Sequence, residues 1–285
     1  MCRFALYLGS PILVSSLVTE PANSIIHQSF HSHEREEPLN GDGFGLAWYA
    51  PQITDEPTIF KDVTPAWSNE NLLNLARVIE TTCLLAHVRA ATSGLAVTRL
   101  NCHPFAWRSF AFMHNGTIGG FRRLVRRLRQ GLSDEAYQGI QGTTDSEHVF
   151  ALFADHYRQS EETQVIERMA SSLCAAIRSV EEIKRAAGVE EPALLNLAVT
   201  DGCRAVVSRY ITRDPERANT LYVHAGGAYR CEAGVCRMVE ATQRNQAVIV
   251  ASEPLSDDPG WQRVEPNHLV VVHENLTVDL RPLEV

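Results

Sequence analysis

Short strand-forming segments occupy both ends of the chain, and helical segments lie between them. The first segment, residues 2–8, is rich in strand formers and stops at a Gly-Ser-Pro turn. A long helical region follows the TTDSEH segment and runs to about Ala187, and repeated short strands joined by polar turns come after it. No internal repeat, low-complexity tract or linker interrupts the 285 residues. We therefore predict one large domain over residues 1–285, built from sheet, helices and more sheet.

The remaining elements follow from local periodicity and turn signals. Further strands are expected at 46–49, 83–92, 109–116, 248–255 and 268–278, and helices at 13–18, 69–80 and 121–130. The His-rich stretch 25–40 and the proline-bearing stretch before Asn69 are expected to be loops. In the helix at 121–130, arginines surround one apolar stripe, so a solvated helix face is favoured over a nucleic-acid patch.

Composition limits the classes of protein to which the chain can belong. Hydrophobic residues make up 45% of it and charged residues 21%, as in globular proteins. The net charge of -8 argues against a general nucleic-acid or membrane-surface role, because such proteins neutralise phosphates with a basic excess. Gly9, Ser10 and Pro11 interrupt the apolar N-terminal stretch, and no apolar run approaches the roughly 20 residues needed to cross a bilayer. We expect a cytoplasmic protein.

The cysteines and histidines do not form a recognisable metal or disulfide pattern. The seven cysteines are odd in number and scattered, and no CxxC pair occurs among them, so we predict neither a disulfide framework nor a zinc ribbon. His27, His31 and His33 form H-x₃-H-x-H, but no carboxylate or further Cys completes a ligand set. The GDGFG stretch matches neither dinucleotide-binding nor P-loop patterns. We predict no metal and no cofactor.

A cysteine stands directly after the initiator methionine. If Met1 is removed, Cys2 carries both a thiol and a free α-amino group. The pKa of an α-amino group lies near about 8, so this group can take and return a proton next to a nucleophilic sulfur. The alternative is that position 2 tolerates any residue, and taken alone that interpretation is the better one.

Other segments supply groups that complement such a nucleophile. Arg89, at the end of a predicted strand, can bind a carboxylate with two parallel hydrogen bonds. The amide of Asn115 and the backbone N–H of Gly116 can point at one oxygen and stabilise an oxyanion. Asp145, at a predicted helix start, can bind an ammonium group. Together these groups match an amino acid with a side-chain amide.

Each of these residues also has an ordinary structural interpretation. Arg89 can form a structural ion pair, Asn115 and Gly116 can form a hairpin turn of the favoured Asn-Gly type, and Asp145 can be a helix N-cap. Taken singly, each of these interpretations is the better one. Their joint occurrence with Cys2 favours a catalytic site.

The ordered set M-C, HVRAAT, NCHPF, HNGTI and TDSEH resembles the class II glutamine amidotransferases, which are N-terminal-nucleophile hydrolases. The resemblance implies a four-layer αββα sandwich. It also implies Cys2 as nucleophile with its own amine as base, and Asn115 and Gly116 as oxyanion hole. Arg89 and Thr92 would hold the glutamyl carboxylate, and Asp145 its amino group.

No segment after Asp145 is comparable to the synthase domain of the larger relatives. The chain therefore looks like the stand-alone group of YafJ-like proteins, which is related to glutathione-degrading and ergothioneine-pathway γ-glutamyl amidohydrolases. Leu39 and Asn40 replace an Arg-Gly pair found in many members, and Ser93 replaces a frequent His. The implied activity is hydrolysis of glutamine or a γ-glutamyl compound through a Cys2 thioester.

Two other functions stay open at this point. The chain can be a non-catalytic glutamyl-binding subunit that regulates a partner through the arginine-rich helix, or a thiol N-terminal-nucleophile hydrolase acting on another acyl amide. Arg89 and Asp145 favour an amino-acid-like acyl group over the second of these. A partner protein that uses the released ammonia, or a peptidase partner, is also open.

Overall fold

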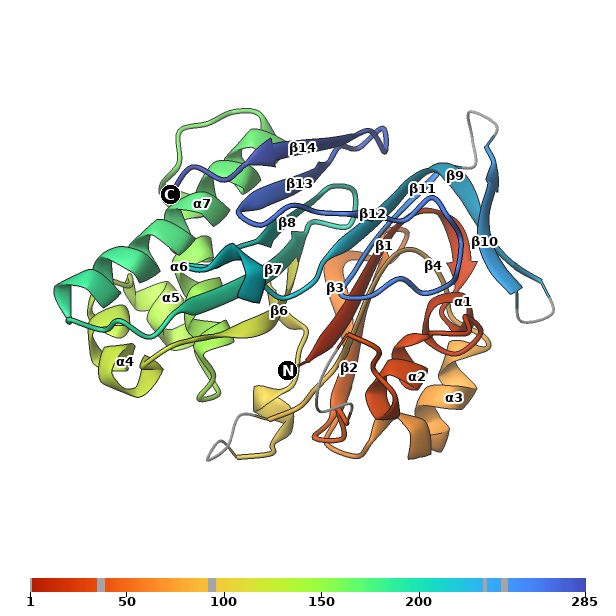
Figure 1. Cartoon of the computed structure of the whole chain (residues 1–285), viewed down its shortest axis with the longest axis horizontal. Coiled ribbons are helices and arrows are strands. Elements are labelled where there is room, and N and C mark those ends of the chain that lie inside the picture. Colours follow the sequence, from red (N-terminus) through yellow and green to blue (C-terminus); the bar gives the residue numbers. More distant parts are fainter. Residues whose placement is uncertain (1, 35–38, 92–95, 233–234, 242–245) are drawn as a thin grey trace.

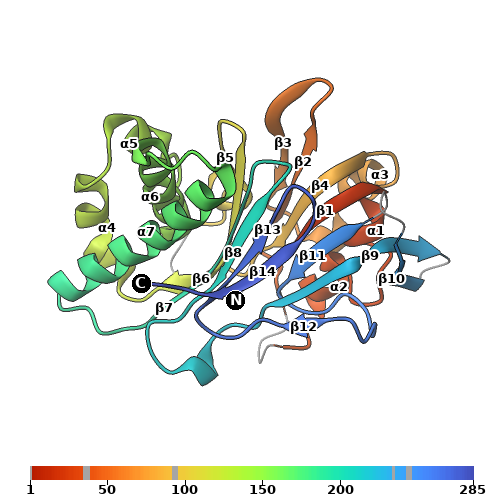
Figure 2. The same cartoon turned by 90° about the horizontal axis from the view of Figure 1, so that it is seen from above.

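The computed structural model contains two antiparallel sheets that face each other, with helices on their outer sides (Figure 1). It describes residues 2–34, 39–91, 96–232, 235–241 and 246–285. Seen from above, helices, sheet, sheet and helices follow one another across the molecule (Figure 2). This arrangement confirms the predicted αββα sandwich.

The first sheet has β1 near its centre. In spatial order it contains β10 (Val235–Glu240), β9 (Tyr222–Glu232), β11 (Ala247–Ala251), β1 (Arg3–Leu13), β4 (Glu80–Val88), β2 (Phe44–Ala50) and β3 (Thr54–Asp62), and β12 (Gln262–Arg263) pairs with β9. The second sheet contains β14 (Val278–Pro282), β13 (His268–Val272), β8 (Ala205–Arg209), β7 (Ala193–Thr200), β6 (Phe110–Ile118) and β5 (Phe105–Trp107).

Helices cover the outer face of each sheet. The first sheet carries α1 (Ser15–Val18), α2 (Ile25–Phe30) and α3 (Glu70–Ala76), and the second carries α4 (Phe121–Gln130), α5 (Asp134–Gly139), α6 (Asp145–Gln159) and α7 (Val165–Ala186) (Figures 1 and 2). Short 3-10 helices lie at Ala66–Ser68, Arg99–Asn101 and Pro215–Arg217. No helix of the described ranges is long and apolar enough to pass through a bilayer.

Strand alternation creates a separate core layer between the sheets. On β1, Phe4, Leu6 and Leu8 face the other sheet, whereas Ala5 and Tyr7 face the helices. Side chains from β6, β8, β11 and β13 fill the same inter-sheet layer. Because side chains alternate with a period of two, Cys2 shares the inter-sheet side with Phe4.

The structure corrects several sequence-based assignments. The stretch 25–40 contains α2, because the Ser24 hydroxyl accepts a hydrogen bond from the His27 N–H and caps the helix. The proline-bearing stretch contains β3. None of its residues is fully buried and several are charged, which is typical of an edge strand and hides the alternation. The long helical region is two helices, and α5 was not predicted.

One disulfide was also missed. Cys231 and Cys236 lie directly opposite each other on the antiparallel β9–β10 pair, with Cα atoms 4.0 Å apart, and their sulfurs are bonded. The spacing alone does not reveal that both residues face each other in one hairpin register. The five other cysteines, including Cys2, are free thiols.

Candidate active site

Cys2 lies at the start of β1, beside the end of β4. Arg3 pairs with Val88 in the antiparallel β1–β4 ladder, so Cys2 stands next to the residues that follow β4. The Cys2 Sγ donates a hydrogen bond to the Ala90 carbonyl oxygen over 3.6 Å, and the residue is half-buried. The thiol is therefore adjacent to Arg89.

A buried ion pair fixes the strand at this point. The Arg3 guanidinium contacts the Glu253 carboxylate at 2.5 Å, with side-chain exposures of 2% and 0%, and it also donates to the Cys2 carbonyl oxygen over 3.0 Å. The Ser32 hydroxyl and the His33 N–H donate to the same carboxylate. Burial acts to raise the pKa of Glu253, but Arg3 and these donors together hold it below its usual value. Glu253 is thus ionised and anchors the start of β1.

Arg89 is held by the glycine-rich loop before β2. Its N–H donates to the Gly43 carbonyl oxygen over 2.8 Å, and the Asp42 carboxylate accepts the Ala91 N–H over 2.7 Å. Gly43 has a φ of 106°, and a Cβ there would meet the Cys102 Sγ at 2.7 Å, so the loop requires glycine.

The Arg89 side chain is only 3% exposed and donates over 3.5 Å to the Asp42 backbone carbonyl oxygen. Within the described parts of the chain it forms no ion pair with a carboxylate, so the structural ion-pair interpretation is not supported there. Thr92, the predicted partner of Arg89, falls outside the described residues.

Asn115 and Gly116 lie inside β6 and not in a turn, so the hairpin-turn interpretation is wrong. Asn115 pairs with Asn196 on β7. The fully buried Asn115 Nδ2 donates to the Ser252 hydroxyl over 3.2 Å, and this hydroxyl also accepts the Phe4 N–H over 3.1 Å. Ser252 thereby connects the second sheet to β1, two residues from Cys2.

Gly116 is required by the packing of the second sheet. A Cβ at this position would meet the Leu194 carbonyl oxygen at 1.8 Å and the His114 Nε2 at 2.7 Å. The strand β6 therefore approaches β7 in a way that no other residue type allows.

Asp145 is positioned against the end of β6. Its carboxylate accepts the Ile118 N–H over 2.8 Å and the Ser146 N–H over 2.9 Å. The N-cap of α6 is Thr144, whose hydroxyl accepts the Glu147 N–H, so the interpretation of Asp145 as a plain N-cap is wrong. The carboxylate therefore bonds the backbone of β6 three residues after Asn115.

The NCHP segment supports the same helix start. The Asn101 side-chain oxygen accepts the Thr143 N–H over 2.9 Å, and its Nδ2 donates to the Thr143 hydroxyl over 3.1 Å. The Ser146 hydroxyl contacts the His114 Nδ1 at 2.9 Å. The N-x-H-P and H-N-G segments thus both bond to residues at the start of the T-D-S-E segment or directly before it, which explains why the three segments occur together.

Three buried histidines lie behind these segments. The rings of His87 and His103 stack with centroids 4.2 Å apart, and the His87 Nε2 contacts the His114 carbonyl oxygen at 3.2 Å. Burial lowers the pKa of His87 to about 3 and lowers those of His103 and His114, with repulsion from neighbouring cationic groups adding to the effect for His87 and His103. All three imidazoles are neutral near pH 7.

Strand alternation brings a set of polar side chains to one end of the inter-sheet layer, which we call the polar end. On each strand concerned, the polar residue continues the alternation of the buried apolar residues before or after it. The members are Cys2, Arg89, Asn115, Asn196, Arg209 and Ser252, with Asn219 beside them. The register of both sheets places all of these strand ends on the same side of the molecule.

Sequence reasoning missed six residues that connect the polar end, and all of them are buried. They are Arg3, Asn196, Arg209, Asn219, Ser252 and Glu253. The signal that could have found some of them is a polar residue inside an apolar strand run, as in LLNLAVT and VIVASE.

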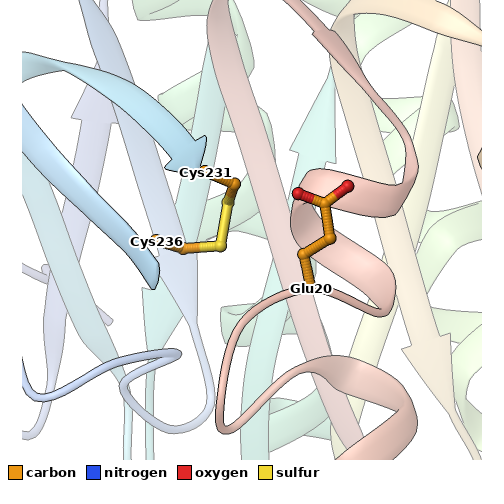
Figure 3. A group of neighbouring side chains, drawn as sticks. All are labelled: Glu20, Cys231 and Cys236. Atoms are coloured by element: carbon orange, nitrogen blue, oxygen red, sulfur yellow. A yellow bond between two sulfur atoms is a disulfide. The ribbon is translucent and has the colours of Figure 1, made fainter. Parts of the chain in front are cut away.

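No group in the described residues forms a ready metal site. The rings of His27, His31 and His33 have centroids 5.2 to 5.9 Å apart, but their nitrogen atoms do not converge. Across the described ranges, the one group with three ligand-type atoms within 4.8 Å of one another is Glu20, Cys231 and Cys236 (Figure 3). Its sulfurs are bonded to each other, so this group offers one carboxylate and no thiolate.

Comparisons with known proteins place these features in a wider context. A family model described as Glutamine amidotransferases class-II matches residues 13–282. The probable glutamine amidotransferase DUG3 of Saccharomyces cerevisiae is 41% identical over 99% of this chain and 84% of its own length. The gamma-glutamyl-hercynylcysteine sulfoxide hydrolase of Mycolicibacterium smegmatis is 27% identical over 96% of both chains.

A solved structure shows the same architecture. The glutamine aminotransferase class-II domain protein of Silicibacter pomeroyi superposes over 100% of both chains with a TM-score of 0.67 and 26% identity. A glutamine phosphoribosylpyrophosphate amidotransferase of B. subtilis matches with a TM-score of 0.60 over 50% of its own chain, at 16% identity, which concerns the fold alone.

Proposed function

The chain belongs to the class II glutamine amidotransferases, and on this premise we propose that it hydrolyses the side-chain amide of glutamine or a γ-glutamyl compound. One relative is named for hydrolysis of a γ-glutamyl compound and another as a probable glutamine amidotransferase. The observation that supports the proposal most is the polar end, where strand register brings a free thiol, a buried guanidinium and a buried amide to the same end of the inter-sheet layer.

The proposed nucleophile is Cys2 after removal of Met1. The α-amine takes the thiol proton, and the sulfur attacks the amide carbon of the substrate, so that a carbon–sulfur bond forms. The proton passes to the departing nitrogen, the carbon–nitrogen bond breaks and a glutamyl thioester remains. Water then adds to the thioester, the carbon–sulfur bond breaks, and glutamate leaves while the sulfur regains its proton.

The proposed oxyanion hole consists of the Asn115 amide and the Gly116 N–H. As placed, the Ser252 hydroxyl accepts two hydrogen bonds and donates none, whereas the buried Asn115 Oδ1 has no partner. Turning the Asn115 amide by half a turn satisfies both groups, because the Ser252 hydroxyl can then donate to Oδ1. The Nδ2 hydrogens are thereby freed for a substrate oxygen.

The proposed glutamyl contacts are made by Arg89, Thr92 and Asp145. Arg89 would bind the substrate carboxylate together with Thr92, and Asp145 would bind the ammonium group. An ionised carboxylate has about four acceptor sites. Asp145 accepts from two backbone N–H groups and, more weakly, from the Ser146 hydroxyl, so acceptor capacity is left for a substrate.

Cys2→Ala tests the proposal directly. We expect glutamate release to fall by at least about 10⁴-fold, because the covalent step is lost, while thermal unfolding stays as in the wild type. Glutamate should be measured with glutamine, glutathione and γ-glutamyl amines as substrates. Full activity of the variant would refute the role of Cys2, and no release from any substrate by the wild type would favour a binding subunit.

Intact mass tests the role of the amine. An active preparation should lack the mass of Met1. Because an amide nitrogen cannot accept the thiol proton, an active enzyme that keeps Met1 would contradict the amine as base.

We further propose that residues 1–285 form a single amidotransferase domain in the cytoplasm. Both ends of the chain contribute to the inter-sheet layer, from Phe4 to Val272, which supports one domain. The net charge of -8 supports the location, and so does the excess of free thiols, since five of the seven cysteines are free and two form the Cys231–Cys236 disulfide. Limited proteolysis that releases two stable fragments would contradict the single domain.

A further inference from the structure

Two cysteines and a carboxylate lie together away from the proposed active site. One ligand-type atom of each of Glu20, Cys231 and Cys236 lies within 4.8 Å of those of the other two. The cysteines face each other across the β9–β10 pair, and Glu20 follows the end of α1 (Figure 3). Both cysteines pack in the core on the helix-covered side of the first sheet, whereas Cys2 shares the inter-sheet side. The sheet therefore separates this group from the polar end.

Reduction of the disulfide would turn this group into a set of metal ligands. Each cysteine sulfur would then carry a thiol, and loss of its proton gives a thiolate, which is a preferred ligand of zinc. The strand register keeps both sulfurs side by side, because the two Cα atoms are 4.0 Å apart. Zinc bonds are about 2.3 Å long to sulfur and about 2.0 to 2.2 Å to oxygen, so one ion can reach ligand atoms that lie this close together.

The Glu20 carboxylate is already oriented for such a role. It is half-buried, and within the described residues it forms no ion pair. The Ser15 hydroxyl donates to the Glu20 Oε1 over 2.6 Å, and such a hydrogen bond is typical of a carboxylate that ligates a metal. The Cys231 Sγ lies 3.3 Å from the Ser16 carbonyl oxygen, which brings this sulfur to the same helix end.

We propose that the reduced protein binds one Zn²⁺ ion through Cys231, Cys236 and Glu20, and that formation of the disulfide releases the ion. Water occupies the fourth position of the tetrahedron. Binding displaces the two thiol protons, and the ion neutralises two of three negative charges that would otherwise repel one another. Thiolate ligands favour zinc over magnesium and calcium, whose ligands are oxygen atoms.

The exchange between the two states requires an oxidant. In the cytoplasm proposed for this protein, the glutathione pool keeps most thiols reduced, and glutathione disulfide is the oxidant that we invoke. One cysteine thiolate attacks it, so that a mixed disulfide forms and one glutathione thiolate leaves; the second cysteine thiolate then displaces the other. The cysteines lose two electrons, the two glutathione thiolates gain them and take two protons from water, and Zn²⁺ is left with the Glu20 carboxylate alone and dissociates.

The zinc content of the two redox forms tests the proposal. Full-length protein with a histidine-free tag is prepared with seven thiols in the reduced form and five in the disulfide form. Both forms are equilibrated with zinc and desalted, and the bound metal is measured by mass spectrometry. We expect one zinc ion per chain in the reduced form and none in the disulfide form. Glutathione disulfide added to the zinc-loaded protein should release one ion for each disulfide formed.

Variants assign the ligands. Cys231→Ser and Cys236→Ser should each abolish binding of one ion per chain. Glu20→Gln should weaken zinc binding at least about 10-fold, since loss of a group that only orients a ligand already weakens it by about 10- to 100-fold. Cys174→Ser is the matched control, because it removes a half-buried thiol from α7 over the other sheet, and it should bind zinc as the wild type does.

Four results would overturn the proposal: no zinc in the reduced wild type, equal zinc in both redox forms, full binding by either Cys231→Ser or Cys236→Ser, or zinc that stays bound in the presence of glutathione disulfide. Unchanged affinity in Glu20→Gln would overturn the role of Glu20. Glutamate release is not measured in this test, so its outcome leaves the proposed hydrolysis at Cys2 unaffected.

Discussion

The two ends of the inter-sheet layer differ in chemistry although the same strands form both. At one end Phe4, Leu6, Met113 and Val250 are fully buried and apolar. At the polar end the next positions of the alternation hold a thiol, a guanidinium, amides and a hydroxyl, and most of these residues are equally buried.

The difference between the ends has an energetic meaning. An unpaired buried polar group destabilises a fold by about 1 to 3 kcal/mol. Among the described residues, the Asn196 Oδ1 lacks a partner, and so does one end of the Asn115 amide, in whichever of its two orientations it lies. Side chains like those at the apolar end would fill the space without this penalty. A polar end that costs stability is typical of a site that is retained for its chemistry.

Of the variants that compare the two ends of the layer, Asn115→Ala should show the largest effect, and this effect should be on the rate. Removing the amide takes away one proposed oxyanion donor, so we expect kcat to fall by about 10² to 10³-fold. The free energy of unfolding should change little, because an unpaired polar group is removed together with one hydrogen bond. Glutamate release and urea unfolding measure the two quantities, and unchanged kcat would show that the two ends do not differ in function.

Met113→Ala should show the opposite pattern, since Met113 lies two residues before Asn115 on the same side of β6. Loss of its fully buried side chain should lower the free energy of unfolding by about 2 to 3 kcal/mol. The kcat of the folded fraction should stay near the wild-type value. A large loss of kcat under conditions in which the variant is fully folded would contradict the functional difference between the two ends.

The third prediction concerns pH and has a smaller effect. The pKa of His87 is about 3 in the fold and near 6.5 in the unfolded chain, so the unfolded state binds more protons between these values. Stability is therefore fully present above about pH 6.5 and is lost as the pH falls toward 3. His87 should contribute a loss of about 2 kcal/mol between pH 7 and pH 5.

Urea unfolding at pH 7 and pH 5 measures this change of the free energy of unfolding with pH, which we call the pH slope. His87→Gln should reduce it, whereas His31→Asn, which changes an exposed residue, should not. An equal pH slope of the free energy of unfolding for the wild type and His87→Gln would mean that burial does not lower the pKa of His87.

Periodicity and turn signals were sufficient to predict about half of the strands and the order of sheet, helices and more sheet, because these depend on local alternation. The αββα sandwich was predicted from the resemblance to the class II glutamine amidotransferases. The edge strand β3 escaped prediction since it buries little, and α2 escaped because its cap lies in a polar stretch. The Cys231–Cys236 disulfide could not be predicted, because it depends on the register of one hairpin.

The residue types of the proposed site could be predicted, but their connections could not. The motif residues Asn101, Thr143 and Asp145 can be recognised in the sequence. Only the structure shows that Asn101 bonds Thr143 and that Asp145 bonds the Ile118 N–H. Ser252 and Glu253 act through contacts that span about 250 positions of the chain, and no local pattern encodes such contacts.

The hydrogen bond from the Arg3 guanidinium to the Cys2 carbonyl oxygen fixes the backbone of Cys2 just before β1. Any affinity tag fused in front of Cys2 would turn the amine of the proposed base into a peptide nitrogen. A tag after Val285 avoids this effect, and that terminus lies near α7 on the helical side of the second sheet (Figure 1). Recombinant enzyme for every assay above should therefore carry its tag at the carboxyl end.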